Sequence, residues 1–384
     1  MRIIRKSSYL LVAASLLLLN ACKDYNREQT IVAGGKLDQV MMMMDDSLVK
    51  TSFSDSIANA FFAPIPVLPQ AEPQFLLNIR DFSRYQKARS VFHKYRNLSF
   101  VALVKGNAPI TRFVRQQLGD EKVKEMLAKK QLFTIKHDQF AREQEVIYMV
   151  AADRSTFLRL FEEQKEALFE EIRKFENQRL WKQLFITGEY VLAEKRMQAD
   201  LGFHFRIPED FQFVEDSGHV FWLRKEVIFQ DRQGQQMKKT REDIYSTRFN
   251  DDRKKAILAI RDEFLAERVA YTWPFSLMDS IARQHIHGIS PQYPIYVDKA
   301  QPIYQRERTI NGIKVLDSRG LWRCDNPFMG GFFYTLTFEH PHSGTLCMIY
   351  GFVYAAGSDK RPLFRKLDAI YETLSIKALK EKEK

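Results

Sequence analysis

The chain has 384 residues, a formal net charge of +11, 45% hydrophobic residues and 3 cysteines. A chain of this kind buries a sizeable core as one large or two smaller domains. The positive charge is spread along the whole length without a nucleic-acid-binding signature, so the composition argues against a nucleic-acid partner. A solvated basic surface close to lipid headgroups is the simpler interpretation.

The first 21 residues have the pattern of a bacterial export signal. Three basic residues precede the apolar run 9–19, whose eleven residues are too few for a permanent span of about twenty. The run ends in Leu19-Asn20-Ala21-Cys22, which resembles a lipobox, where a small residue precedes the cysteine that takes the lipid. We therefore expect residues 1–21 to be a removed signal peptide and Cys22 to carry palmitate and diacylglycerol.

Processing before Cys22 removes three basic residues and no acid, so the net charge falls from +11 to +8. Residues 22–38 are polar, contain a glycine pair and read as a lipidated tether to the fold. The tether begins with Lys23-Asp24 but lacks the run of acids of a surface-export tag. The sequence thus predicts a membrane-anchored protein of the cell envelope, at the outer membrane and facing the periplasm.

Residues 39–153 alternate short apolar runs with helical patterns, which predicts an N-terminal α/β sandwich half. The four consecutive methionines 41–44 are expected to pack in the core, because neighbouring strand residues point to opposite faces and cannot converge on a metal. Strands are expected at 39–44, 74–79, 97–104, 132–135 and 145–150, and helices at 54–62, 82–95 and 110–130.

Residues 154–200 have apolar residues at helical spacing, which predicts a long connecting helix, or a helix pair broken at Asn177 or Gly188. Residues 201–378 read as a C-terminal α+β half with an antiparallel meander. The fold class is therefore α+β, with helices packed on mixed and antiparallel sheets. In this half strands are expected at 211–214, 219–229, 294–297, 304–309, 314–316, 321–324, 333–338 and 346–354, turns at 231–234, 311–312, 318–320 and 340–344, and helices at 251–270 and 359–374.

Several segments of the C-terminal half form a recognisable set: Arg319-Gly320-Leu321-Trp322, Asn326-Pro327-Phe328-Met329-Gly330-Gly331, Phe352-Val353-Tyr354-Ala355 and Asp359-Lys360-Arg361. With them the chain resembles a family of Bacteroidota lipoproteins known as domain of unknown function 4837. Glu72-Pro73-Gln74-Phe75, Phe82 and Tyr95-Arg96-Asn97 extend the resemblance to nearly the whole mature chain. The resemblance implies no activity, and Arg323 and Phe332 depart from the family's usual Glu and Pro.

The most specific of these segments suggests a candidate ligand or partner surface. A loop at Met329-Gly330-Gly331 would present bare backbone amides to a ligand, although paired glycines more often permit a tight chain crossing. Arg319, Trp322, Asp325 and Asn326 would rim that loop, or serve as turn residues around a half-buried tryptophan.

Other candidate chemistry is sparse. Cys324 and Cys347 fall in strands of the same meander, so they are either a disulfide or two buried thiols. His285-Ile286-His287 would be half a metal site if extended, but no further ligand follows at a recognisable spacing, and His340 and His342 read as solvated turn residues.

No catalytic signature is present, and neither a metal nor a cofactor is predicted. We therefore expect a non-catalytic envelope protein that binds a partner protein or ligand. The alternative is an envelope hydrolase with its site near Gly330-Gly331.

Overall fold

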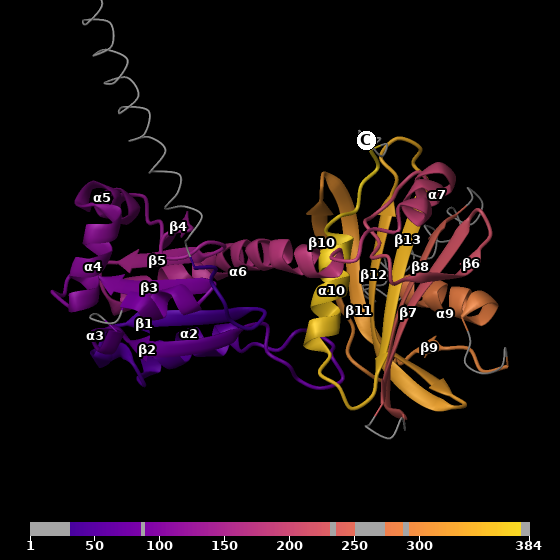
Figure 1. The fold of residues 1–384 in the computed structure, drawn as a ribbon, viewed down its shortest axis with the longest axis horizontal. Helices are drawn as coiled ribbons and strands as arrows, with labels where there is room; N and C mark the ends of the chain where they lie inside the picture. The colour runs from indigo at the N-terminus through magenta and orange to yellow at the C-terminus, as the bar shows by residue number, and fades with distance from the viewer. Residues whose placement is uncertain (1–30, 86–88, 231–235, 250–272, 287–291, 378–384) are drawn as a thin grey trace, which may run out of the picture. The chain divides into compact units, whose positions relative to one another are not determined.

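A computed structural model describes residues 31–85, 89–230, 236–249, 273–286 and 292–377. The expected signal peptide, Cys22, the start of the tether, the turn at 231–234 and the helix at 251–270 lie outside these residues. The chain divides into two compact units (Figure 1). Unit 1 comprises Met1–Phe62 and Phe75–Phe175, and unit 2 comprises Ala63–Gln74 and Glu176–Lys384. The α+β fold class is confirmed.

Unit 1 is a five-stranded sheet in the order β2-β1-β3-β5-β4, with helices on both faces (Figure 1). Neighbouring strands are parallel except for β4, which is antiparallel to β5. The strands are β1 (Gln39–Met44), β2 (Leu76–Asp81), β3 (Asn97–Leu103), β4 (Phe133–His137) and β5 (Glu145–Ala151). The helices are α2 (Ser52–Phe61), α3 (Phe82–Tyr85), α4 (Pro109–Leu118), α5 (Asp120–Ala128) and the part of α6 (Arg154–Leu184) up to Phe175, with short 3-10 turns at Asp46–Leu48 and Arg89–Lys94.

The methionines of β1 pack in the core, as expected from strand alternation. Met42 and Met44 lie in the apolar layer under α2 and α6, whereas Met41 and Met43 lie in the layer under α3, α4 and α5. All four side chains are at most 3% exposed. β1 is thus a central strand that is buried on both faces.

Two helix expectations need correction, and a third, the break at Asn177 or Gly188, is resolved in favour of Gly188. The helix expected at 82–95 is only the short α3 followed by the 3-10 turn. The helix expected at 110–130 is broken between α4 and α5 at Gly119, whose φ of +84° an L side chain rarely adopts. The long helix α6 runs through Asn177, and the break falls near Gly188, before α7 (Val191–Leu201).

Unit 2 is built on a long, mainly antiparallel sheet in the order β10-β11-β12-β13-β8-β7-β6, with β9 beside β11. The strands are β6 (Gln212–Asp216), β7 (Val220–Gln230), β8 (Gln236–Arg248), β9 (Tyr296–Val297), β10 (Tyr304–Ile310), β11 (Ile313–Asp325), β12 (Phe328–Glu339) and β13 (Leu346–Ala355). Besides α7, unit 2 contains the helices α9 (Trp273–His285) and α10 (Arg361–Tyr371).

Helices lie on both faces of this sheet (Figure 1), and each face carries a separate core. On one face α7 and α10 cover an apolar layer that contains Tyr334 and Cys347. On the other face α9 covers a layer that contains Trp222, Trp322 and Cys324. None of the helices in the described ranges is both long and apolar enough to cross a membrane.

Segment 63–74 groups with unit 2, although unit 1 lies on both sides of it in the sequence. The Glu72 carboxylate accepts hydrogen bonds from the backbone N–H groups of Lys360 at 2.6 Å and Arg361 at 2.9 Å. Because these amides open α10, Glu72 caps that helix from a distant part of the chain.

Candidate functional site

The residues expected to rim a glycine loop lie on one long β-hairpin, β11–β12. Gly330 and Gly331 are part of β12 and pair with Arg323 and Trp322 of β11, so the interpretation as a ligand-binding loop is wrong. The other interpretation, that the paired glycines permit a close approach of the chain, agrees with the structure. A Cβ at Gly331 would lie 1.8 Å from the Val353 carbonyl oxygen, and a Cβ at Gly330 would lie 2.8 Å from that of Trp322.

The turn expected at 318–320 is also wrong, because β11 continues through it. A Cβ at Gly320 would lie 2.4 Å from the ring of Phe333, so this glycine makes room for an aromatic side chain on the paired strand. Glycine in a strand often marks such a close approach instead of a turn.

Trp322 and Arg319 are buried and do not form a surface. Trp322 is 1% exposed and meets Phe352 edge-on with ring centroids 6.0 Å apart. Arg319 is 6% exposed and makes a bidentate ion pair with the buried Asp317, at 2.8 and 2.6 Å. Burial alone would lower the pKa of Arg319, but Asp317 and its neighbours raise it above the usual value. Arg319 therefore stabilises the packing of the sheet on α10, where its guanidinium lies 4.7 Å from the Phe364 ring centroid, and Trp322 stabilises the core under α9.

The tip of the hairpin is the part of the candidate surface that reaches solvent. Asp325 and Asn326 are exposed, and Phe328, the first residue of β12, is 86% exposed. Met329 is half-buried and packs against the α9-side core. The tip thus presents a large aromatic side chain on a structured turn.

A small polar network braces this tip. The Tyr296 hydroxyl donates to Asp325 at 2.8 Å and accepts a hydrogen bond from Arg323, whose guanidinium also lies over the Tyr296 ring, 5.1 Å from its centroid. Burial and the hydrogen bond to Asp325 raise the pKa of Tyr296. Strand β9 is therefore fixed to β11 just below Phe328.

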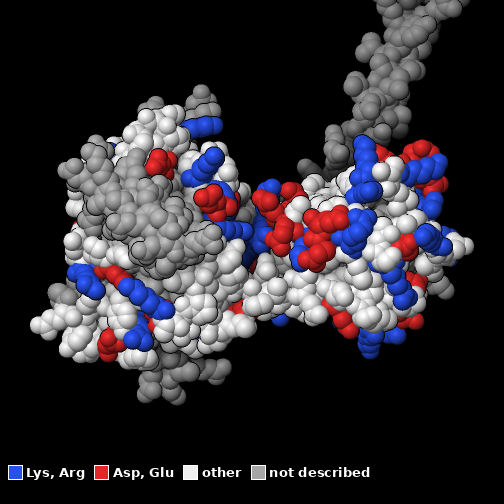
Figure 2. All heavy atoms as spheres, turned by 180° about the vertical axis from the view of Figure 1, so that it is seen from behind, with Lys and Arg blue, Asp and Glu red and all other residues white. Residues whose placement is uncertain are grey.

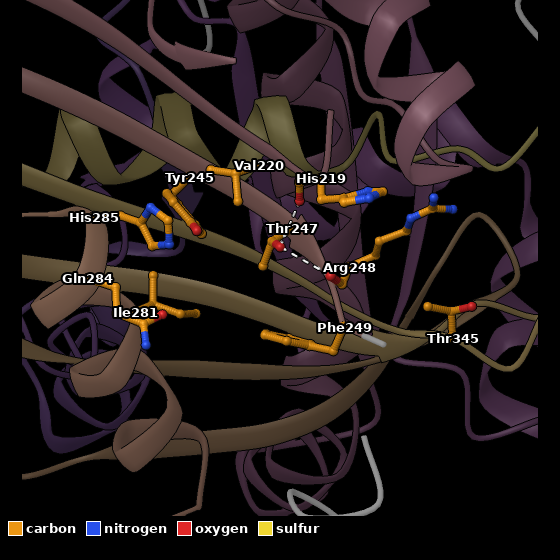
Figure 3. Close-up of a pocket in the computed structure, with 10 residues that line it drawn as sticks. All are labelled: His219, Val220, Tyr245, Thr247, Arg248, Phe249, Ile281, Gln284, His285 and Thr345. Carbon is orange, nitrogen blue, oxygen red and sulfur yellow. Dashed lines mark hydrogen bonds between the residues drawn. The ribbon is translucent and has the colours of Figure 1, made fainter. Parts of the chain in front are cut away.

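A pocket of about 490 Å³ lies elsewhere in unit 2, where the ends of β7 and β8 meet α9 (Figure 3). Tyr245 and His285 lie at one end, and Arg248 and Thr345 at the other. The His285 ring contacts the Glu215 carboxylate with Nδ1 and Oε2 3.2 Å apart. The Thr247 hydroxyl donates to the His219 carbonyl at 2.8 Å, so it is not poised as a nucleophile.

The two cysteines and two histidines that the sequence singled out are not brought together in one site. Cys324 and Cys347 are free, buried thiols on opposite faces of the sheet, which rules out a disulfide between them in this fold. Burial raises the pKa of Cys347 to about 12. His340 is only 8% exposed and contacts the Gly202 carbonyl at 3.0 Å through Nε2, so its expected solvation is wrong, whereas His342 is exposed.

The condition for a half metal site, an extended His285-Ile286-His287 segment, is not met at its first residue, because His285 ends α9. Ile286 is buried, and His287 lies outside the described residues. Within the described part of the chain, no group of three His, Cys, Asp or Glu side chains is placed to hold a metal ion.

Surface charge does not gather in one patch on the face shown in Figure 2, where basic and acidic side chains are interspersed. Sequence reasoning missed Phe328 as a site residue, and it also missed the pocket beside His285. Phe328 carried a signal in its position between a proline and a glycine pair. The pocket carried none, because its walls come from segments that are distant in sequence.

Two family models match the chain. Residues 191–373 match "Domain of unknown function (DUF4837)", and residues 33–185 match "Domain of unknown function (DUF8532)". The first match supports the resemblance over the C-terminal half. The N-terminal half matches a different model, so the expected coverage of nearly the whole chain by one family needs correction. No curated protein matches the chain.

Proposed function

We propose that this protein is a lipid-anchored lipoprotein of a Bacteroidota cell envelope, which binds a partner protein through the tip of the β11–β12 hairpin. The anchor rests on the basic, apolar and lipobox-like segments that precede and include Cys22. Its expected location is the outer membrane, with the body facing the periplasm. A mature lipoprotein carries several acyl chains, and each buried CH₂ adds about 0.8 kcal/mol, so attachment is close to permanent.

The observation that carries the binding role is the 86% exposure of Phe328 on a braced turn. Moving the Phe328 side chain from water into an apolar pocket of a partner would stabilise the complex by about 1.5–3 kcal/mol. Aromatic anchors of this kind dominate many protein interfaces. The braced turn also lowers the entropy lost on binding, because Arg323, Tyr296 and Asp325 already hold one another.

The hydrolase alternative depended on a loop at Gly330 and Gly331. Both residues pair within the sheet, so they form no nest of free amides. No observation at this position favours a reaction over binding.

The test is a co-purification of the lipidated protein from solubilised envelope. Phe328→Ser is expected to lose the bound partner while the protein remains folded. The matched control is Ile186→Ser, since Ile186 is 81% exposed in the same unit but belongs to the segment between α6 and α7 and not to the hairpin. If the partner stays bound to Phe328→Ser, the hairpin tip is not the binding surface.

A further inference from the structure

A second cavity, of about 490 Å³, lies in unit 1 at the carboxyl-terminal edge of its sheet. Its walls are the segments that follow three neighbouring strands. They are residues 45–48 after β1, residues 105–111 after β3 and residues 152–154 after β5. None of these segments belongs to unit 2.

The topology of the sheet explains why a cavity opens here. The helices after β1 and β5 place Phe53 and Phe157 in the core on one face, whereas the helix after β3 places Phe113 in the core on the other face. The chain therefore leaves β3 toward one side of the sheet and leaves its two neighbours, β1 and β5, toward the opposite side. In open parallel sheets, such a divergence creates the crevice in which ligands bind.

The floor of the cavity is apolar. Leu48, Val101 and Ile110 line it and are each at most 3% exposed. A cavity of this size with apolar walls and a few polar groups has the character of a small-molecule site.

The rim carries charges of both signs. Its carboxylates use a larger share of their hydrogen-bonding capacity within the protein than its cations do. Asp153 accepts hydrogen bonds from Lys105 Nζ at 2.5 Å, from the Ser155 hydroxyl at 2.9 Å and from the Thr156 N–H at 3.0 Å. These hydrogen bonds, that of Lys105 first, hold the pKa of Asp153 well below its usual range. Asp45 likewise accepts from the N–H and hydroxyl of Ser47, at 3.1 and 2.6 Å.

The two cations at the rim, Lys105 and Arg154, have N–H donors that make no hydrogen bond within the described chain. A lysine ammonium has three N–H donors, and Lys105 uses one on Asp153. A guanidinium has five, and Arg154 uses one on the Ser47 carbonyl at 3.1 Å. Lys105 and Arg154 keep more unused donors than Asp45 and Asp153 keep unused acceptor positions, so the rim favours a ligand that supplies acceptor oxygens with negative charge.

We propose that this cavity binds a small organic anion with an apolar body, with the body on Leu48, Val101 and Ile110 and the anionic group between Lys105 and Arg154. The site is independent of the hairpin tip in unit 2. Lys105 is 71% exposed, so the anion contact is solvent-screened and weakens with added salt.

Gly106 offers a way to fill the cavity without disturbing the fold. It lines the cavity, its φ is not in the left-handed region, and an added Cβ would have only the Leu103 carbonyl oxygen near it, at 3.8 Å. Gly106→Leu therefore occupies the mouth with a side chain. Gly34→Leu is the matched control, because Gly34 has similar room, with its nearest atom at 3.6 Å, and lies outside the cavity.

The experiment uses the mature chain with Cys22→Ala, which needs no detergent, and two fluorescent probes. Anilinonaphthalene sulfonate is an apolar anion, and phenylnaphthylamine is its neutral counterpart. Gly106→Leu is expected to weaken the binding of both probes by about tenfold or more, because it removes the space they share. Lys105→Gln and Arg154→Gln are each expected to weaken the binding of the sulfonate alone, by roughly three- to tenfold.

Lys129→Gln is the charge control, since Lys129 is 67% exposed and also paired with a carboxylate, on α5. It and Gly34→Leu are expected to bind both probes as the parent does. Three outcomes would overturn the proposal: a parent that binds neither probe, a folded Gly106→Leu that binds both like the parent, or glutamine variants that leave the preference for the sulfonate unchanged.

Discussion

Two buried tryptophans allow a matched comparison of what one hydrogen bond contributes to unit 2. Trp322 on β11 and Trp222 on β7 lie in the same core, with ring centroids 6.0 and 6.4 Å from Phe352. They differ at the indole nitrogen. Trp222 Nε1 donates to the buried Asp243 at 2.9 Å, whereas Trp322 Nε1 has no hydrogen-bond acceptor within the described chain.

The expected cost of Trp→Phe follows from this difference. Both substitutions shrink a packed ring and leave a small cavity, which costs about 1 kcal/mol. Trp222→Phe also removes a hydrogen bond to a carboxylate, worth about 1.5–3 kcal/mol. Trp322→Phe instead removes an unpaired buried N–H group, which offsets part of the cavity cost. Trp222→Phe is therefore expected to be the more destabilising by about 2 kcal/mol.

Equilibrium urea denaturation followed by tryptophan emission measures this difference directly. All four tryptophans, at positions 181, 222, 273 and 322, fall within unit 2, so the signal reports that unit alone. Equal losses of unfolding free energy in the two variants would refute the assignment of the Asp243 hydrogen bond. A larger loss for Trp322→Phe would show that its indole nitrogen has a partner after all.

Further predictions test the packing, the thiols and the anchor. Gly331→Ala is expected to prevent unit 2 from folding, because its Cβ would lie 1.8 Å from the Val353 carbonyl oxygen; a native-like emission spectrum would contradict this close approach. With Cys22 substituted, Cys324 and Cys347 are expected to resist thiol reagents at pH 8 and to react on unfolding, since both are buried and the pKa of Cys347 is raised to about 12; rapid labelling of the native protein would contradict their burial. Cys22→Ala is expected to keep the fold and lose lipid, and metabolic labelling with a fatty acid that still marked this variant would refute the anchor. Protease added to intact cells is expected to spare the body, and its degradation would place the body on the cell surface.

The sequence was sufficient for strands that are continuous apolar runs. β1, β3 and β5 are apolar runs that are buried on both faces, and their bounds follow closely from composition. The strand β8 was missed because charged residues fill it. Glu242 and Asp243 within it are 3% and 0% exposed, and their burial depends on partners such as Arg224 on the neighbouring strand. Burial raises the pKa of both carboxyl groups.

The sites were harder to predict than the elements. The glycines at 320, 330 and 331 suggested loops, but their role depends on Phe333, Trp322 and Val353 across the sheet. Only the pairing of the strands reveals those neighbours. The cavity in unit 1 depends on which face each helix takes after its strand, and a helical pattern predicts an apolar face without saying on which side of the sheet it packs.

The central claim is that the tip of the β11–β12 hairpin contacts a partner in the envelope. Site-specific incorporation of a photo-crosslinking phenylalanine analogue at position 328 of the lipidated protein, in intact cells, tests it most directly. Position 186, exposed in the same unit, is the control. We predict a discrete adduct of one partner from position 328 and none from position 186. Irradiation that gives no adduct at 328, or the same adducts at both positions, would contradict the account.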